Sequence, residues 1–148
     1  IRLDFIKSIN IEKFIIGGGY WLKKKNNLYA KVMPHIHGKK LFDITNSSVI
    51  SLNILRPQNL TSHNMRTFEI PSMNGLMLTT RSNEQNLFFK ENKECFMYNG
   101  KKELKNKIKY IMNNPVIANK VRAKGFLISK KYTYKSRVKF LLKYIFKK

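Results

Sequence analysis

The chain is poor in acidic residues and in cysteine. Only 8 of its 148 residues are Asp or Glu, against 30 Lys and Arg, so its formal net charge is +22. Cys95 is the only cysteine, which excludes an internal disulfide and a cysteine-based zinc site. No run reaches the roughly 18 apolar residues of a membrane-spanning helix, and the first residues lack the apolar core of a signal peptide. A single cysteine also fits a reducing compartment, so we expect a cytoplasmic protein.

The basic charge is concentrated toward the C-terminus. Residues 101–148 hold 16 Lys and Arg and one acid, whereas residues 1–100 hold 14 and 7. Such a surface attracts nucleic acid, anionic membranes or phosphate-bearing small molecules. However, 24 of the 30 basic residues are Lys, and nucleic-acid sites use more Arg because its planar fork matches phosphates and bases. We therefore favour a solvated basic surface over a dedicated nucleic-acid-binding one.

Apolar periodicity predicts one α/β domain over the whole chain, since 43% hydrophobic residues are enough for a core. The predicted strands cover residues 14–16, 32–34, 49–55, 75–80 and 95–98. The predicted helices cover residues 1–10, 38–46, 83–90, 101–113, 115–129 and 134–146, with a further short helix around Glu69. Residues 20–27 are predicted as a polar connection, and Glu103 and Lys107 as a pair on the outside of the helix 101–113. The alternation predicts a parallel sheet flanked by helices and three closing C-terminal helices.

Two loops carry residue types that suit a ligand. Gly17, Gly18 and Gly19 follow the first strand, and glycines there let the backbone approach a phosphate closely. Their spacing matches neither a dinucleotide fingerprint nor a P-loop, so a simple tight turn is the plainer interpretation. His35 and His37 follow the second strand and could touch a metal from one side. Because no nearby third ligand is evident apart from His63 and the acids, we expect no metal site.

The stretch from Asn64 to Thr80, NMRTFEIPSMNGLMLTT, combines a polar turn, a short helix and an apolar strand. Its carboxylate, Glu69, looks buried between Phe68 and Ile70, which is notable in a chain with so few acids. These residues by themselves favour a helix N-terminal charge or a salt bridge with Arg66. Ligands of parallel sheets lie beyond the carboxyl ends of the strands. We therefore expect this stretch and the glycine turn to lie there.

Six segments keep a common order and spacing along nearly the whole chain. They are GGGYW (17–21), NSSVISLNILR (46–56), RTFEIPSMNGLMLTT (66–80), NLFFKENKECFMY (86–98), KELKNKIKYIMNNP (102–115) and AKGFLISKKYTYKSRVKFLL (123–142). Together they resemble the C-terminal half of GT-B glycosyltransferases, in the group 1-type branch that includes spore-maturation-like proteins. The resemblance implies a Rossmann-like domain that takes part in transferring a sugar from a nucleotide-sugar to an acceptor of unknown identity.

The resemblance also implies roles for particular residues. In the family, a glutamate bonds the donor ribose hydroxyls, a helix start with its cation contacts the diphosphate, a glycine turn borders the cleft, and a nearby loop lines the nucleobase. The matching positions are Glu69 for the ribose, Asn64, Arg66 and Thr67 for the diphosphate, Gly18 and Gly19 for the turn, and His35 for the nucleobase. No metal or cofactor is required beyond the nucleotide-sugar, which is the substrate.

The chain departs from the family pattern in several places. It starts inside the first helix of the domain, so we expect one strand, one phosphate-facing loop and the acceptor-binding half to be missing. Tyr132 stands where the family has a His. We therefore expect residues 1–148 to be a single nucleotide-sugar-binding domain, truncated at its N-terminus, that needs its missing N-terminal half for activity. A nucleic-acid-binding domain and a non-catalytic scaffold are the alternatives.

The final segment, RVKFLLKYIFKK (137–148), mixes apolar and basic residues at helical spacing. A basic amphipathic helix of this kind could lie on anionic lipid at the inner face of the membrane. Packing onto the missing N-terminal half is an alternative that the sequence leaves open.

Overall fold

The computed structural model describes residues 2–9, 11, 14–24, 26, 28–56, 59 and 61–146. Ile1 and Asn10 of the predicted first helix, Lys25 and Asn27 of the predicted connection, and the final Lys147 and Lys148 lie outside the described residues. The elements are α1 (Arg2–Lys7), β1 (Ile15–Gly17), α2 (Gly19–Leu22), β2 (Lys31–Met33), α3 (Gly38–Ser47), β3 (Ser51–Asn53), α4 (Arg66–Ser72), β4 (Met77–Thr80), α5 (Asn83–Phe88), β5 (Phe96–Tyr98), α6 (Gly100–Asn113), α7 (Pro115–Ser129), the 3-10 helix η3 (Lys130–Tyr132) and α8 (Tyr134–Ile145).

All of these strands pair in parallel, and they form two sheets. β1 pairs with β2, while β3, β4 and β5 lie side by side in that order. Parallel neighbours need crossover connections, and α2, α4 and α5 lie in the crossovers between paired strands. The predicted α/β class, with parallel strands flanked by helices as in a Rossmann-like domain, is confirmed.

The three-stranded sheet is covered on both faces. Leu78 and Phe96 join a buried cluster with residues of α6 and α7. Their neighbours in the chain, Met77 and Met97, join a second cluster with Ile70 of α4. Successive side chains of a strand point to opposite faces, so β4 and β5 each contribute side chains to both clusters.

The prediction of a polar connection over residues 20–27 is wrong at residues 20–22, which belong to α2, a helix that begins directly at Gly19. Trp21 of this helix is only 7% exposed and packs in a cluster with Ile16 and Ile54. Gly18, which precedes the helix, has a φ of 131°, a value that side chains disfavour. A four-residue helix is too short to show apolar periodicity, so tertiary burial of one indole decides this element.

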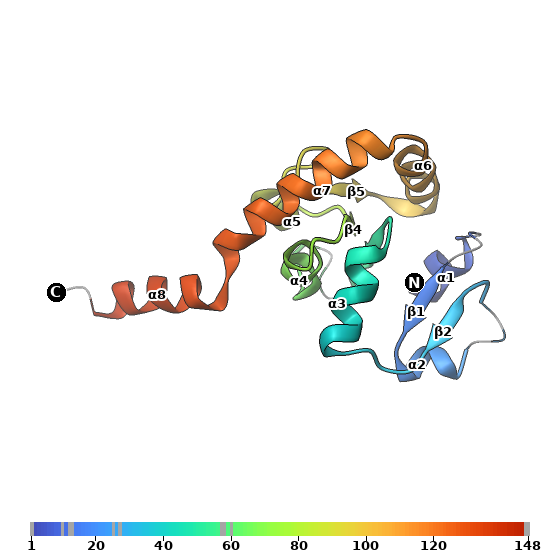
Figure 1. Cartoon of the computed structure of the whole chain (residues 1–148), viewed down its shortest axis with the longest axis horizontal. Coiled ribbons are helices and arrows are strands. Elements are labelled where there is room, and N and C mark those ends of the chain that lie inside the picture. The colour runs from blue at the N-terminus through green and yellow to red at the C-terminus, as the bar shows by residue number, and fades with distance from the viewer. Residues whose placement is uncertain are drawn as a thin grey trace.

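The three predicted closing helices are present, and they differ in how they relate to the body. α6 and α7 pack on it, and α7 runs so close to the carbonyl of Glu94 that any side chain at Gly125 would collide with it. α8 has no buried residue and projects away from the body, on the side opposite to α1, β1 and β2 (Figure 1). Within the described part of the chain, no helix combines the length and the apolar character that a bilayer crossing requires.

Candidate functional site

A cleft of about 560 Å³ lies where the loops after three strands meet the start of α4. The turn of residues 17–19 follows β1, His35 follows β2, Arg56 follows β3, and Arg66 is the first residue of α4. β1 and β2 pair in parallel and end at the same edge, which brings the first two loops together. The loop after β3, which belongs to the other sheet, reaches the same cleft. Arg2, Leu3, Tyr20 and Trp21 complete the lining. The cleft therefore has the location that the sequence predicts for a ligand.

Three of the six arginines of the chain line this cleft, namely Arg2, Arg56 and Arg66. No Asp or Glu belongs to the lining, and no carboxylate among the described residues forms an ion pair with any of the three. Burial, followed by repulsion from Arg66 and Arg56, lowers the pKa of Arg2. Its Nε is buried, and no described residue accepts a hydrogen bond from it. Guanidinium groups that converge without a counter-charge favour an anion such as a phosphate.

Four of the predicted donor-binding residues, Gly18, Gly19, His35 and Arg66, line this cleft together. A side chain at Gly19 would place its Cβ 3.4 Å from Nε2 of His35, so the turn and the histidine are close neighbours. The ring of His35 stacks on that of His37 with centroids 5.7 Å apart. The described residues contain no group of three or more His, Cys, Asp or Glu that could hold a metal ion.

The other three, Asn64, Thr67 and Glu69, are not part of the lining. The amide of Asn64 exchanges hydrogen bonds of 3.1 and 3.0 Å with the amide of Asn53 at the end of β3. Thr67 is fully buried, and its hydroxyl accepts from the backbone N–H of Asn64 at 3.4 Å. Glu69 is half-buried, less than the sequence suggests, and no ion pair joins it to Arg66 in the described part of the chain.

Further contacts fix the loop before α4 onto α5. The carboxylate of Glu84 accepts from the hydroxyl of Ser62 and lies 2.7 Å from Nδ1 of His63. The Ser62 hydroxyl, and then His63, lower the pKa of that carboxyl. The hydroxyl of Ser82 donates to the carbonyl of Ser62 at 2.7 Å. These contacts hold the loop that leads to Arg66 at the edge of the cleft.

Arg2 and Arg56 were not predicted as site residues. Arg2 lies far from Arg66 in the sequence and outside the six segments that carry the family resemblance. Arg56 lies ten residues before Arg66 and ends one of those segments, NSSVISLNILR (46–56), which was a signal that could have marked it. For Arg2 the available signal is composition, because arginine is rare among the basic residues of this chain. Which of the few arginines lie together in space can be read only from the folded structure.

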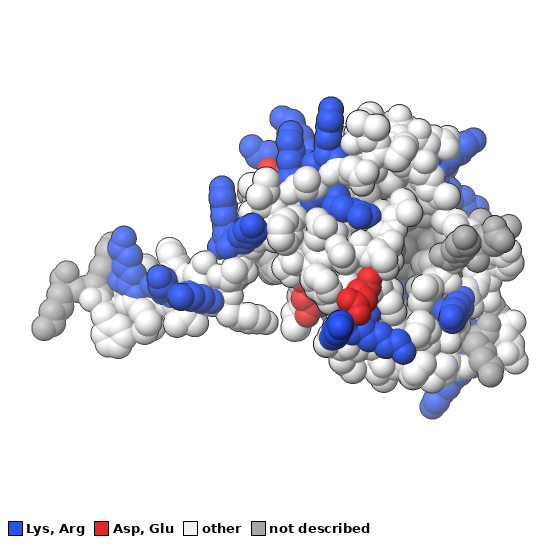
Figure 2. Space-filling view, viewed as in Figure 1, with Lys and Arg blue, Asp and Glu red and all other residues white. Residues whose placement is uncertain are grey.

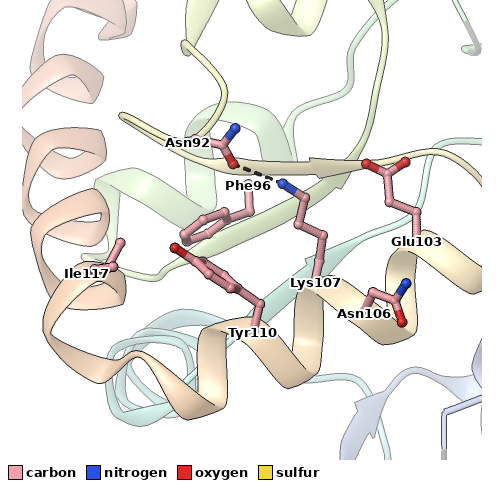
Figure 3. A pocket seen from close by; sticks show the side chains of 7 residues that line it. All are labelled: Asn92, Phe96, Glu103, Asn106, Lys107, Tyr110 and Ile117. Carbon is pink, nitrogen blue, oxygen red and sulfur yellow. Dashed lines mark hydrogen bonds between the residues drawn. The ribbon is translucent and has the colours of Figure 1, made fainter.

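A second hollow, of about 520 Å³, lies beside the edge strand β5 and the helices α6 and α7 (Figure 3). Its charged groups already have partners: Nζ of Lys107 donates to Asn92 at 2.9 Å and lies 3.5 Å from Glu91, and Glu103 accepts from Arg81. The predicted pair of Glu103 with Lys107 is therefore wrong. The planar fork of Arg81 binds both carboxylates more favourably than the point charge of a lysine. This hollow offers no unpaired charge to a ligand.

The family model described as "Glycosyl transferase-like" matches residues 2–143. The chain belongs to this glycosyl transferase-like family. Membership supports glycosyl transfer as the activity at a coarse level, and it confirms the glycosyltransferase resemblance to that extent. No curated protein matches this glycosyl transferase-like chain.

Proposed function

We propose that this glycosyl transferase-like chain is the donor-binding, C-terminal half of a GT-B glycosyltransferase, of the group 1-type branch that includes spore-maturation-like proteins. It binds a nucleotide-sugar, and an N-terminal half of the enzyme holds the acceptor and supplies the catalytic base. One observation carries the proposal: Arg2, Arg56 and Arg66 converge in a cleft whose lining has no carboxylate. A nucleotide-sugar has a diphosphate at its centre, which matches this charge.

In this proposal the three arginines act on the leaving group. When the bond between the sugar and the diphosphate breaks, the bonding electron pair stays on the diphosphate oxygen. Cations beside the diphosphate stabilise the charge that develops there. The glycine turn contributes by allowing the phosphates to approach the backbone closely. The arginines thereby supply positive charge that other transferases take from a metal ion.

Glu69 and His35 have separate roles in the proposal. A carboxylate only accepts hydrogen bonds, which suits the two hydroxyls of a ribose. Glu69 lies one helical turn after Arg66 and has no ion-pair partner among the described residues, so its acceptor oxygens remain available. His35 lies against the glycine turn and lines the cleft, which supports a role for its ring beside the nucleobase.

Ligand-induced stabilisation tests the proposal with the chain as it exists. UDP, GDP, ADP and their sugar conjugates are each compared with the matching nucleoside while the unfolding temperature is measured. At least one nucleoside diphosphate should raise the unfolding temperature, since a ligand that binds only the folded state stabilises it. The nucleosides should have much less effect. Lys40→Ala, which removes an exposed cation outside the cleft, serves as the control.

Two outcomes would contradict the proposal. Salt-sensitive binding of RNA or DNA, with no response to any nucleoside diphosphate, would favour the nucleic-acid-binding alternative. A folded chain that responds to neither class of ligand would favour a non-catalytic scaffold.

A further inference from the structure

The helix α8 carries an apolar stripe of five residues that nothing in the described chain covers. Tyr134, Val138, Leu141, Leu142 and Ile145 recur at the spacing of one helical face. Their exposed fractions lie between 48% for Leu142 and 80% for Tyr134. A continuous apolar face of this length on an exposed helix marks an interaction surface.

The charge beside this stripe has a single sign. Lys135, Lys139 and Lys143 recur every four residues and so form a row along the helix. No Asp or Glu occurs anywhere in residues 104–148. Figure 2 shows the basic side chains of α8 gathered along one flank, with uncharged atoms over the rest of the visible helix. The helix therefore presents an apolar stripe with a purely basic border.

The helix is already formed and its start is fixed to the body. The hydroxyl of Thr133 caps the helix by accepting from the N–H of Ser136 at 3.1 Å. The guanidinium of Arg137 lies 4.9 Å from the centre of the Phe68 ring. Beyond this anchor the helix projects from the body (Figure 1). Because the helix is already formed, binding a partner costs less conformational entropy than it would if the segment had to fold on binding.

We propose that α8 docks on the surface of an anionic lipid bilayer. The apolar stripe enters the boundary between headgroups and acyl chains, and the lysine row binds the lipid phosphates while its methylene stems cover apolar surface. The single sign of the charge favours lipid over a protein partner. A bilayer supplies uniform negative charge beside a continuous apolar layer, whereas a protein would need an acidic rim matched to this one helix. This inference does not depend on donor binding by the cleft, and it competes with packing of α8 onto an N-terminal half.

Vesicle co-sedimentation of the full chain tests the proposal. The wild type should bind vesicles of phosphatidylcholine mixed with phosphatidylglycerol, but not phosphatidylcholine alone, and high salt should weaken binding. The double variant Leu141→Gln/Leu142→Gln and the triple variant Lys135→Gln/Lys139→Gln/Lys143→Gln should each bind the anionic vesicles at least about tenfold more weakly. Both variants should keep the fold, because α8 buries no residue. Circular dichroism and the unfolding temperature check this.

Matched controls make the same chemical changes elsewhere on the surface. Leu87→Gln alters an apolar residue that is 79% exposed, and Lys23→Gln/Lys24→Gln/Lys39→Gln removes three exposed cations from the body. Each control should change vesicle binding by less than about threefold, since neither touches α8.

Three results would overturn the proposal. Equal losses in the two lysine triple variants would mean that the net charge of the whole chain adsorbs to the vesicles. Unchanged binding after the leucine substitutions would mean that the stripe does not enter the bilayer. If the wild type ignores vesicles but self-associates, and the leucine variant is monomeric, a second copy of the chain covers the stripe instead.

Discussion

Arg81 and the arginines of the cleft show two opposite uses of the same residue in one domain. Arg81 donates hydrogen bonds of 3.0 and 2.7 Å to Glu91 and of 3.0 and 2.6 Å to Glu103. These bonds raise the pKa of Arg81 and lower that of Glu103 to about 2. In the cleft, burial and then repulsion from Arg66 and Arg56 lower the pKa of Arg2, and no carboxylate of the described chain pairs with it.

Arg81 is a cation paired within the fold, whereas the cleft arginines are the cations that the proposed function assigns to a ligand. The Arg81 cluster is neutralised internally and ties the end of β4 to the residues around β5 and α6. The cleft arginines repel one another, which is unfavourable unless an anion joins them. Each of the following experiments challenges or refines this contrast.

The largest expected effect on stability comes from Arg81→Met. It leaves Glu91 and Glu103 without their main partner, and bonds to charged groups contribute about 1.5–3 kcal/mol each. The three side chains are partly exposed, so solvent screens the loss, and we expect the free energy of unfolding to fall by about 2–3 kcal/mol. Urea denaturation measures it. Arg81→Lys, which keeps the charge without the planar fork, should recover only part of the loss. No change in either variant would remove the structural role of Arg81.

Arg66→Ala should have the opposite profile. We expect nucleoside diphosphate to bind about tenfold to hundredfold more weakly, because a charge-assisted bond to phosphate is lost. The free energy of unfolding should stay the same or rise slightly, since repulsion in the cleft is relieved. Isothermal titration calorimetry and urea denaturation measure the two quantities. Arg56→Ala is a parallel test and Lys40→Ala the control. If the affinity for the bare nucleoside falls as much as that for the diphosphate, Arg66 shapes the cleft and does not bind phosphate.

Glu69→Gln should weaken nucleotide binding by about tenfold, which corresponds to one bond to a charged acceptor. The effect should depend on the ribose. Wild type should prefer a ribonucleotide to its 2′-deoxy counterpart, and the variant should lose most of this preference. Calorimetry with matched nucleotide pairs measures it. A variant that keeps the full preference would exclude Glu69 from the ribose site.

The smallest expected effect is on the acid dependence of stability. The folded pKa of Glu103, about 2, lies below its ordinary value of 4.5. The stabilisation is therefore fully present above about pH 4.5 and is lost as the pH falls toward 2. Partial exposure limits its size. Urea midpoints measured across this range should fall more steeply for the wild type than for Arg81→Met, and added salt should reduce the difference. Parallel curves would show that the Arg81 bonds do not set this pKa.

Much of the fold could be predicted because its signals are local. The apolar runs at β4 and β5 alternate between two cores, and the periodicity of α6 places Leu104, Ile108 and Ile111 in one cluster. The predicted helices and strands are present with modest shifts at their ends. The exception, α2, depends on the burial of Trp21 by residues distant in sequence. A helix that is stabilised mainly by such distant contacts shows no apolar periodicity in its own sequence.

The sequence by itself determined the parallel α/β class, the glycine turn, the stretch around Arg66 and the basic amphipathic helix at the C-terminus. These follow from residue order, spacing and composition, which act over a few residues. Only the tertiary structure decided which cations are free. In the folded chain, Glu103 forms its ion pair with Arg81 and not with Lys107. Arg2 and Arg56 line the same cleft as Arg66. Electrostatic interactions depend on distance in space, and the path of the folded chain sets that distance.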